Sequence, residues 1–470
     1  MGFVADTREW SESVFGGCEL GDFRRVDRFV DYAARQALAP AASTSGACQG
    51  DAAAHQGAYK LLRNASVRPE DIDDGAFDAV AEAAACCALV LAIQDSTGVG
   101  FNPPMAKALA AEGSPTGFVV HSTLLVDALG GSLIGVVDQQ RWVREPKQGK
   151  EPRAKRTYRE KESFKWEAAQ ERVLHRVADM SRVITVCDRE ADIYDYLRYM
   201  RARGQRFVQR ACTDRSLETT EGRLWETLER SPVLGQRTVQ IQQRGGQLGG
   251  DGQSARLSRA AREALVTIRS ASVSLSAPGD RRGEPPVAVN VVFVREENAP
   301  ARETPLEWML LTTEPVATFA EAQTVVEHYE KRWFIEEFHK AWKSGCRVEE
   351  RPFQTLDALK RMTAITAHIA VRILQLRTAA SSSTDSPCET VLKTDEWQCL
   401  WSTTQHKPLP DATPTARWAM VAIARLAGWQ DTKHTGRVGW PTLWRGWELL
   451  QDRVLVWRVA LTSAAASAGR

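Results

Sequence analysis

The stretch Ala88-Leu-Val-Leu-Ala-Ile-Gln-Asp95 is a short run of apolar residues, several of them branched, that ends in a carboxylate. A run of this length and composition predicts a β-strand buried on both faces of a sheet. A second run, Arg182-Val-Ile-Thr-Val-Cys-Asp188, has the same character and also ends in an aspartate. Because ligands of open α/β sheets gather at the carboxyl ends of the strands, the two runs place Asp95 and Asp188 at a candidate site.

A segment with helical periodicity supplies a third acidic residue. Four polar residues fall within an arc of about 60° on one helical face: Tyr329, Arg332, Glu336 and Lys343. Three apolar residues lie on the opposite side: Ile335, Phe338 and Trp342. The spacing therefore predicts one long helix over 319–342. Its polar face is either a solvated ladder of ion pairs or a phosphate-binding site, and the helix alone leaves both interpretations open.

The three carboxylates together suggest metal chemistry. Asp95, Asp188 and Glu336 would offer only oxygen ligands, which suits a hard divalent cation such as Mg²⁺ or Mn²⁺. Two such ions, roughly 4 Å apart, can activate a water or a 3′-hydroxyl and stabilise the departing oxygen in phosphodiester displacement. Taken singly, an aspartate at the end of a strand is more often a turn or helix cap. The combination of strand, strand and helix favours the metal site.

Other strand signals outline the rest of the sheet. Two apolar runs at 122–129 and 132–137 flank Gly130-Gly131, which predicts a hairpin with a two-residue turn. Residues 216–300 contain several short β-patterned runs, including separate runs at 265–268 and 273–275. Glycines at 245–252 separate these runs from earlier ones. We expect a β-rich insertion at 216–300, between elements of the main sheet.

The chain is too long for one compact domain and divides into three predicted parts. We expect residues 1–70 to form a helical domain, residues 71–372 an α/β domain that holds the insertion and the three carboxylates, and residues 373–470 a Trp-rich helical domain. The Ser- and Ala-rich stretch 379–387 is the expected linker. In the first part, the arginines at 24, 25 and 28 suit either phosphate contacts or a solvated helix face.

Composition excludes several classes of protein. The 470 residues carry a net charge of only +2, so any basic footprint for DNA must come from local clustering. No apolar run approaches the roughly 20 residues that a bilayer requires, and the first ten residues do not read as a signal peptide. Nine cysteines without a Cys-x-x-Cys pair indicate reduced thiols rather than a zinc site. The chain also lacks the P-loop and nucleophile-elbow motifs, which argues against ATP-driven and serine-hydrolase chemistry.

The residues also carry a family likeness. Tyr329-x-x-Arg332-x-x-x-Glu336-x-x-x-x-x-x-Lys343 resembles the Tyr-Arg-Glu-Lys signature of the bacterial insertion-sequence transposases of the DDE type. Further strings resemble the same family in order along nearly the whole chain: Gly57-Ala-Tyr-Lys-Leu-Leu-Arg-Asn64, Val186-Cys-Asp-Arg-Glu-Ala-Asp192, Glu303-Thr-Pro-Leu-Glu-Trp308 and Glu389-Thr-Val-Leu392. The resemblance implies an RNase-H-like (retroviral integrase-like) core, with Asp95, Asp188 and Glu336 as catalytic acids that hold two Mg²⁺ ions, for which Mn²⁺ would substitute.

The resemblance further implies cut-and-paste transposition through nicking, hairpin formation, hairpin opening and joining to target DNA. Phosphates near the scissile bond would be held by Tyr329, Arg332, Lys343 and Arg210. Trp308 would stack on a flipped base; as a lone residue it also suits a core position. Residues 1–70 would be the DNA-binding domain and would read the end sequence through Arg25, Arg28, Lys60 and Arg63. Residues 71–372 would be the catalytic domain, and residues 373–470 the dimerisation domain.

The expected partners are double-stranded DNA, both as transposon-end inverted repeats and as target, and a second copy in a homodimeric paired-end complex. We expect no membrane association and a cytoplasmic, nucleoid-associated location in bacteria. The segment 144–162 departs from the family in being far more basic than expected. Two rival functions remain open: a metal nuclease with the same core but no strand transfer, and a non-cutting DNA-binding inhibitor.

Overall fold

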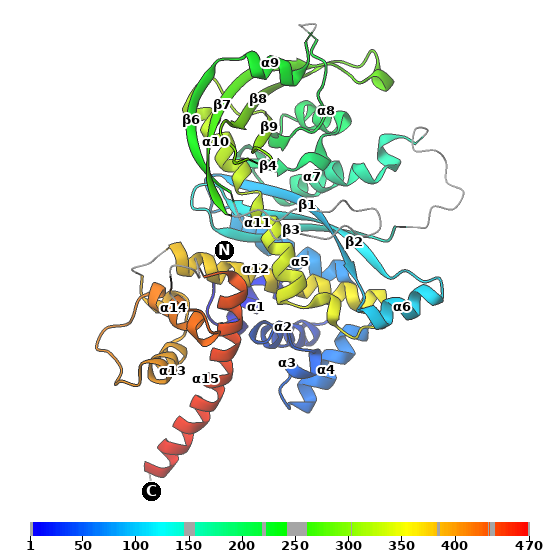
Figure 1. Ribbon diagram of the computed structural model, residues 1–470. Coiled ribbons are helices and arrows are strands. Elements are labelled where there is room, and N and C mark those ends of the chain that lie inside the picture. The colour runs from blue at the N-terminus through cyan, green and yellow to red at the C-terminus, as the bar shows by residue number, and fades with distance from the viewer. Residues whose placement is uncertain are drawn as a thin grey trace.

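The computed structural model describes residues 3–144, 156–218, 222–241, 261–301, 303–382, 386–430, 432 and 438–468. Its strands are Val90–Gly100 (β1), Gly117–Asp127 (β2), Leu133–Trp142 (β3), Val183–Cys187 (β4), Arg206–Arg210 (β5), Val233–Ile241 (β6), Arg262–Leu275 (β7), Val287–Glu296 (β8) and Glu307–Thr312 (β9). They form one nine-stranded sheet in the order β3-β2-β1-β4-β5-β9-β8-β7-β6 (Figure 1).

The directions of the strands identify the type of sheet. The strands β3, β2 and β1 form an antiparallel meander, and β4 and β5 then run parallel to β1. The remaining strands, from β9 to β6, alternate in direction. The meander followed by two parallel strands is the arrangement expected of an RNase-H-like core.

The strand β1 is buried on both faces, as its apolar run predicts. Leu91 and Ile93 pack into the large core shared with the N- and C-terminal helices. Val90 and Ala92 point the other way, into a smaller core with helices α5 (Pro69–Ala84) and α7 (Lys165–Arg176). Alternate side chains of a strand point to opposite faces, so Asp95 lies on the same face as Leu91 and Ile93.

Two details of the meander differ from the prediction. The strand β1 does not end at Asp95 but continues to Gly100, because β2 pairs with it as far as Gly117. The predicted two-residue turn at Gly130-Gly131 is a five-residue connection, 128–132, in which Leu129 and Gly131 donate hydrogen bonds to Asp127. Only Gly131, with φ at +67°, needs the left-handed backbone that glycine supplies there.

The insertion extends the main sheet. The strands β6, β7 and β8 continue the sheet beyond β9, and helix α9 (Leu224–Arg230) lies among them. The predicted separate runs at 265–268 and 273–275 belong to one strand, β7, which pairs with β8 from Val266 to Leu275. The predicted glycine-rich punctuation at 245–252 lies outside the described residues.

The N-terminal region is helical, as predicted. Its elements are α1 (Thr7–Phe15), α2 (Phe23–Leu38), α3 (Thr44–Ala47), α4 (Ala52–Arg63) and α5. Two buried arginines of the later chain hold main-chain carbonyls of this region. Arg351 donates to Pro40 and Ala42, and Arg361 donates to Leu62 and Val67.

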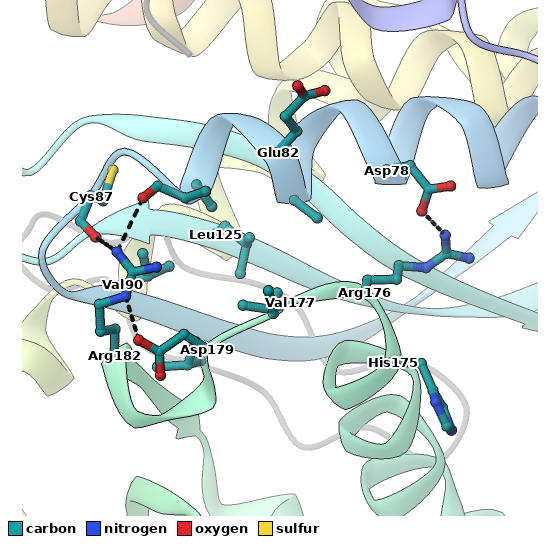
Figure 2. Close-up of a pocket in the computed structure, with 15 residues that line it drawn as sticks. Asp78, Glu82, Cys87, Val90, Leu125, His175, Arg176, Val177, Asp179 and Arg182 are labelled. Carbon is teal, nitrogen blue, oxygen red and sulfur yellow. Dashed lines mark hydrogen bonds and ion pairs between the residues drawn. The ribbon is translucent and has the colours of Figure 1, made fainter.

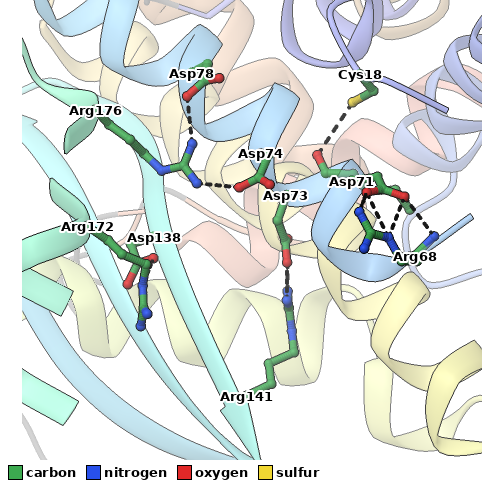
Figure 3. A network of polar contacts seen from close by, with 11 residues as sticks. Cys18, Arg68, Asp71, Asp73, Asp74, Asp78, Asp138, Arg141, Arg172 and Arg176 are labelled. Atoms are coloured by element: carbon green, nitrogen blue, oxygen red, sulfur yellow. Dashed lines mark hydrogen bonds and ion pairs between the residues drawn. The ribbon is translucent and has the colours of Figure 1, made fainter. Parts of the chain in front are cut away.

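A set of ion pairs joins helix α5 to the meander and to α7 (Figure 3). Asp73 and Arg141 form a buried pair between α5 and β3, with 3.1 Å between Arg141 Nη2 and Asp73 Oδ1. Arg176 of α7 pairs with Asp74 and with Asp78, 2.6 Å away in the latter case. Helix α5 is therefore fixed to the central sheet.

The remaining helices surround the sheet. They are α6 (Pro103–Ala111), α8 (Tyr194–Ala202), α10 (Phe319–Glu330), α11 (Trp333–Lys340), the π-helix η7 (Ala341–Gly345), α12 (Leu356–Ser382), α13 (Thr394–Gln405), α14 (Ala416–Leu426) and α15 (Trp440–Ala468). In Figure 1 helices α1 to α4 and α12 to α15 gather on one side of the meander, and α7 and α8 lie on the other.

Helix α12 runs through one predicted domain boundary and into the predicted linker. It passes through residue 372, where we expected the catalytic domain to end, and reaches into the expected linker at 379–387. The other expected boundary, after residue 70, lies inside α5. Residues 383–385 of the linker lie outside the described part of the chain. No helix of the described residues is long and apolar enough to cross a membrane.

Candidate active site

Asp95 and Asp188 lie side by side on neighbouring parallel strands. The last registered pair between β1 and β4 is Ile93 with Val186, and each aspartate follows its member of that pair by two residues. The Asp95 carboxylate accepts a hydrogen bond from the Ser96 N–H at 2.7 Å, and the Asp188 carboxylate accepts one from the Glu190 N–H at 2.8 Å. The structure therefore brings together the two aspartates that the sequence singled out.

Asp95 lies in surroundings that favour its protonated form. Burial and the neighbouring charges of Asp188 and Glu336 raise the pKa of Asp95 to about 7, against the opposing effects of the Ser96 N–H and Arg332. Burial also raises the pKa of Asp188. A buried carboxyl whose pKa is raised by neighbouring carboxylates lacks positive charge nearby, which a divalent cation can supply.

The predicted single helix over 319–342 is interrupted. The helix α10 ends at Glu330, and α11 begins at Trp333. Between them the main chain tightens: Arg332 donates its N–H to the Tyr329 carbonyl at 3.0 Å, and Ile335 donates to the Arg332 carbonyl at 3.2 Å. Such i to i−3 bonds are those of a 3₁₀ turn and change the direction in which the following side chains point. Because the helix is interrupted, the relative directions of Tyr329, Arg332, Glu336 and Lys343 differ from those calculated for one regular helix.

The interruption aims Arg332 at two of the three predicted acids. Its guanidinium pairs with Glu336 on α11, and its Nη1 lies 3.9 Å from Oδ2 of Asp95. The Arg332 side chain is 15% exposed and the Asp95 side chain 19% exposed, so water screens this contact only weakly. Arg332 thus lies between Glu336 and Asp95, and Glu336 lies on the same face of the sheet as Asp95.

Aromatic side chains form the next wall of the site. The rings of Trp308 on β9 and Tyr329 on α10 meet edge to face, with centroids 5.1 Å apart. The guanidinium carbon of Arg332 lies 5.9 Å from the Tyr329 ring centroid. Arg210, at the end of β5, donates to the Glu307 carbonyl at 2.9 Å and interacts with the Tyr329 hydroxyl. Trp308 is half-buried and packs against the core.

Lys343 lies farther along, in the π-helix η7. There the Cys346 N–H donates to the Ala341 carbonyl, five residues back, which inserts an extra residue into the turn. The Lys343 ammonium lies 3.5 Å from Glu349, whose carboxylate accepts the N–H of Gly100 at the end of β1. Lys343 is thus placed near the far end of β1 rather than directly on the three acids.

A buried row of polar side chains supports Asp95 from the opposite face of β1. Gln94 and Ser96 point toward α7, and the Ser96 hydroxyl lies 2.9 Å from Nδ1 of His121 on β2. Burial lowers the pKa of His121 well below its ordinary value, so this imidazole is neutral. The sequence analysis missed His121, because a lone histidine in an apolar strand carries no motif.

Asp192 is a second residue that the sequence analysis gave no role. Its Oδ2 accepts the N–H groups of Cys212 and Thr213, both at 2.8 Å, and its Oδ1 pairs with Arg215 at 2.6 Å. The side chain is fully buried. Asp192 therefore ties the loop after β5 to the loop that carries Asp188. The sequence did contain one signal for Asp192: it ends the family-like string Val186–Asp192, four residues after Asp188.

The donor set fits a hard divalent cation in its chemistry. Asp95, Asp188 and Glu336 offer oxygen atoms only, and a cation would offset the rise that Asp188 and Glu336 cause in the pKa of Asp95. Within the described residues, no three acidic, histidine or cysteine side chains already converge closely enough to hold an ion. The contacts of Arg332 account for this: its guanidinium holds Glu336 and faces Asp95.

The four predicted end-recognition residues lie apart from the acids, in the N-terminal helices. Arg28 on α2 and Lys60 and Arg63 on α4 are exposed, and across the described ranges none of the three forms an ion pair. Arg25 differs, because its guanidinium donates to the Leu20 carbonyl at 2.5 Å.

A cavity of about 270 Å³ lies elsewhere (Figure 2). It opens where β1 and β4 begin, at Val90 and Val183, and the catalytic edge is where they end. Two of its charged residues are already paired: Arg182 with Asp179, and Arg176 with Asp78. The cavity is therefore not the candidate active site.

Comparison with known families matches two parts of the chain. Residues 7–67 match the family described as "Transposase DNA-binding". Residues 118–372, more than half of the chain, match the family described as "Transposase DDE domain". The second match contains Asp188, Glu336 and the aromatic wall, and it begins after Asp95, which the register of β1 and β4 adds to the site.

Proposed function

The chain belongs to the DDE transposases, metal-dependent enzymes that cleave DNA and transfer DNA strands, and we propose that it moves its element by the cut-and-paste route. In this proposal it binds the inverted repeats at the transposon ends, nicks them, forms and reopens a hairpin, and joins the 3′-hydroxyl ends to target DNA. The observation that carries the proposal is the meeting of Asp95, Asp188 and the Arg332–Glu336 pair at one edge of the sheet.

Asp95, Asp188 and Glu336 are the proposed metal ligands and catalytic acids. Their chemistry suits Mg²⁺, with Mn²⁺ as a substitute and two ions at each site. Bound ions would lower the pKa of a water or 3′-hydroxyl and stabilise the departing oxygen. The protein's own part is to hold three carboxylates on rigid elements, two on adjacent strands and one on α11. Ion binding requires Arg332 to give up its contacts with Glu336 and Asp95.

We propose that the released guanidinium of Arg332 then binds a phosphate near the scissile bond. A planar guanidinium binds phosphate oxygens in the same two-pronged way as carboxylates. Arg210 and the Tyr329 hydroxyl lie beside it and would contact the same strand. Lys343, close to the end of β1, would contact the DNA backbone farther along.

Trp308 is the proposed stacking residue for a base that leaves the helix during hairpin formation. The tight hairpin needs one base pulled from the stack, at a cost of a few kcal/mol that an aromatic surface offsets. Its half-buried position and its edge contact with Tyr329 support this role. The sequence strings around Trp308 and Arg332 resemble those of the transposase of transposon five, a hairpin-forming relative.

The N-terminal helices are proposed to read the transposon end through Arg25, Arg28, Lys60 and Arg63. The match of residues 7–67 to a transposase DNA-binding family supports this assignment. Such an enzyme would act at the bacterial nucleoid, where its substrate lies.

A second copy is proposed to complete the paired-end complex through α15. The C-terminal half of this helix extends from the body of the molecule (Figure 1). It carries four exposed apolar side chains: Leu455, Val456, Val459 and Leu461. Apolar residues concentrated on a protruding helix indicate a protein interface.

The decisive test is a cleavage assay on linear DNA that bears the inverted repeats flanking the gene, with Mg²⁺ as the metal. We expect hairpin-ended excision products and joined target DNA. Glu336→Gln should abolish both products. The matched control is Glu337→Gln, because Glu337 is the neighbouring carboxylate of the same helix and pairs with Arg377 outside the site. Equal loss in the two variants would mean that Glu336 has a structural role.

The same assay separates the rival functions. Cleavage without joining would identify a metal nuclease, and end binding without cleavage in either Mg²⁺ or Mn²⁺ would identify an inhibitor. Either result would contradict the proposal.

A further inference from the structure

The first residue of helix α2 is an aromatic side chain turned out into solvent. Phe23 is 78% exposed, more than any other large hydrophobic side chain in the described residues. Isolated surface phenylalanines are common, so exposure alone carries little weight. What distinguishes Phe23 is how firmly its position is fixed and which side chains surround it.

Three local features hold the start of α2 in place. The Asp22 carboxylate caps the helix by accepting the Arg24 N–H at 2.7 Å. The Arg25 guanidinium returns to the Leu20 carbonyl at 2.5 Å and closes the turn. Gly21 has φ at +80°, which permits the sharp entry into the helix. The ring is thus presented by an ordered turn and stays largely exposed to solvent.

The side chains around Phe23 favour an anionic partner. The guanidinium carbon of Arg24 lies 5.7 Å from the Phe23 ring centroid, and Arg28 is exposed one turn farther along α2. Of the acids nearby, Asp27 is already paired with Arg8, and Asp22 is used as the helix cap. An exposed ring next to unpaired arginines suits the grooves of a nucleic acid, where apolar sugar and base surfaces lie between phosphates.

We propose that Phe23 is a DNA contact that wedges against sugars and base edges in the groove of the transposon end, with Arg24 and Arg28 on the phosphates beside it. The inference rests on the proposed function and deepens it, because it adds an apolar contact to end recognition by the N-terminal helices. Aromatic wedges of this kind partly unstack a base step and bend the duplex. Phe23 would therefore favour transposon ends whose base steps unstack and bend easily, in addition to contacting them.

The test compares four variants of the full-length chain: Phe23→Ala, Phe23→Tyr, Arg28→Ala and Leu129→Ala. Leu129 is the matched control, since it is 74% exposed and lies in the β2–β3 connection, away from the N-terminal helices. The probes are a short duplex carrying the flanking inverted repeat and a scrambled duplex of equal length. Dissociation constants are measured over a range of salt concentrations, without divalent metal.

We expect Phe23→Ala to weaken binding of the inverted repeat about tenfold, the effect of losing one aromatic contact with a base. Its dependence on salt should stay that of the unaltered chain, because an apolar contact releases no counterions. Phe23→Tyr keeps the ring and should bind normally. Arg28→Ala should weaken binding and lower the salt slope by about 0.9, the effect of one lost phosphate contact. Leu129→Ala should change nothing.

Several results would overturn the inference. If Phe23→Ala binds like the unaltered chain while Arg28→Ala binds weakly, Phe23 is not a contact and the proposed function stands. If both bind normally, recognition of the end by α2 fails as well. A lower salt slope for Phe23→Ala would mean that the ring only positions Arg24. A change in oligomeric state without DNA would assign Phe23 to a protein interface instead.

Discussion

Arg332 Nη1 lies 3.9 Å from Oδ2 of Asp95, although the two residues come from a helix junction and a strand that are distant in the sequence. The same guanidinium pairs with Glu336. One positive charge thus serves two of the acids proposed to bind metal. The contact makes Arg332 a competitor of the ion that these carboxylates are proposed to bind.

The competition can be measured. We expect Arg332→Gln to bind Mn²⁺ at least about fivefold more tightly than the unaltered chain in the absence of DNA, because a cation close to the site is removed. DNA cleavage should nevertheless fall, since the phosphate contact is lost. Titration calorimetry with Mn²⁺ and the cleavage assay give the two values. Arg377→Gln, which removes the similar pair with Glu337, is the control. Weaker Mn²⁺ binding by Arg332→Gln would show that Arg332 organises the acids instead.

Substitution of Asp95 is expected to stabilise the protein while abolishing cleavage. At pH 8 without metal, Asp95 is ionised in a place that raises its pKa to about 7, so its charge disfavours the folded state. Asp95→Asn removes that charge and should increase the free energy of unfolding by on the order of 2–4 kcal/mol. Thermal unfolding in chelator measures this, and added Mg²⁺ should raise the unfolding temperature of the unaltered chain only.

Asp73→Asn provides the contrasting case. Asp73 is also buried, but it pairs with Arg141, and its replacement leaves that buried guanidinium with Gln139 as an acceptor and no carboxylate. We expect a loss of about 3–5 kcal/mol in the free energy of unfolding. A stabilised Asp73→Asn or a destabilised Asp95→Asn would reverse the assignment of structural and catalytic aspartates.

Trp308→Ala is expected to slow hairpin formation about tenfold and to leave the first nick nearly unchanged. The reason is that only the hairpin step needs a base held outside the stack. Single-turnover assays on an end duplex resolve the two steps. Trp333→Ala is the control, because Trp333 is 42% exposed on α11 next to the site and has no proposed contact with a base. Equal slowing of both steps by Trp308→Ala would remove the stacking role.

Charge placed on the protruding part of α15 should prevent pairing of the ends. Val456 and Val459 are 68% and 62% exposed, so Val456→Glu with Val459→Glu should leave folding intact. We expect complexes with one end to form normally and paired-end complexes to decrease at least about tenfold, because carboxylates at an apolar interface lose their hydration. Gel-shift and mass measurements distinguish the two complexes. Leu129→Glu controls for an exposed apolar residue outside α15.

Acid sensitivity should depend on His368. Burial lowers the pKa of this histidine to about 3, and its ring lies against Phe15 and Phe77. Because the unfolded chain takes up a proton near pH 6.5 and the folded chain does not, this histidine costs stability progressively as the pH falls below 6.5. At pH 4.5 the cost is about 2–3 kcal/mol. His368→Leu should therefore flatten the decline of the unfolding free energy between pH 6.5 and 4.5, and an unchanged decline would contradict the lowered pKa.

The buried strands could be predicted from the sequence because their signal is local. Leu91 and Ile184 face one core, and Val90 and Val183 face the other, so these strands are apolar on both faces. A run of such residues can be recognised without knowledge of its partners. The extension of β1 to Gly100 could not be predicted in this way. Its polar residues from Ser96 onward are held by main-chain pairing with β2, which leaves no hydrophobic pattern.

The interruption of the helix at Lys331 and Arg332 also lay beyond sequence reasoning. Neither glycine nor proline marks the position. The Lys331 ammonium donates to the Ala128 carbonyl, and Arg332 turns to Asp95 and Glu336, so contacts with the distant meander accompany the tightened turn. The periodicity correctly identified Ile335, Phe338 and Trp342 as core residues, all of which are fully buried. It could not show where the regular helix gives way.

Arg351 and Arg361 hold the N-terminal region in place against the later part of the chain. Their side chains bind four main-chain carbonyls, those of Pro40, Ala42, Leu62 and Val67. If, as proposed, α2 and α4 read the transposon end and Asp95 and Asp188 lie at the cutting site, this attachment would fix the number of base pairs between the recognised sequence and the cut bond, as a molecular ruler does.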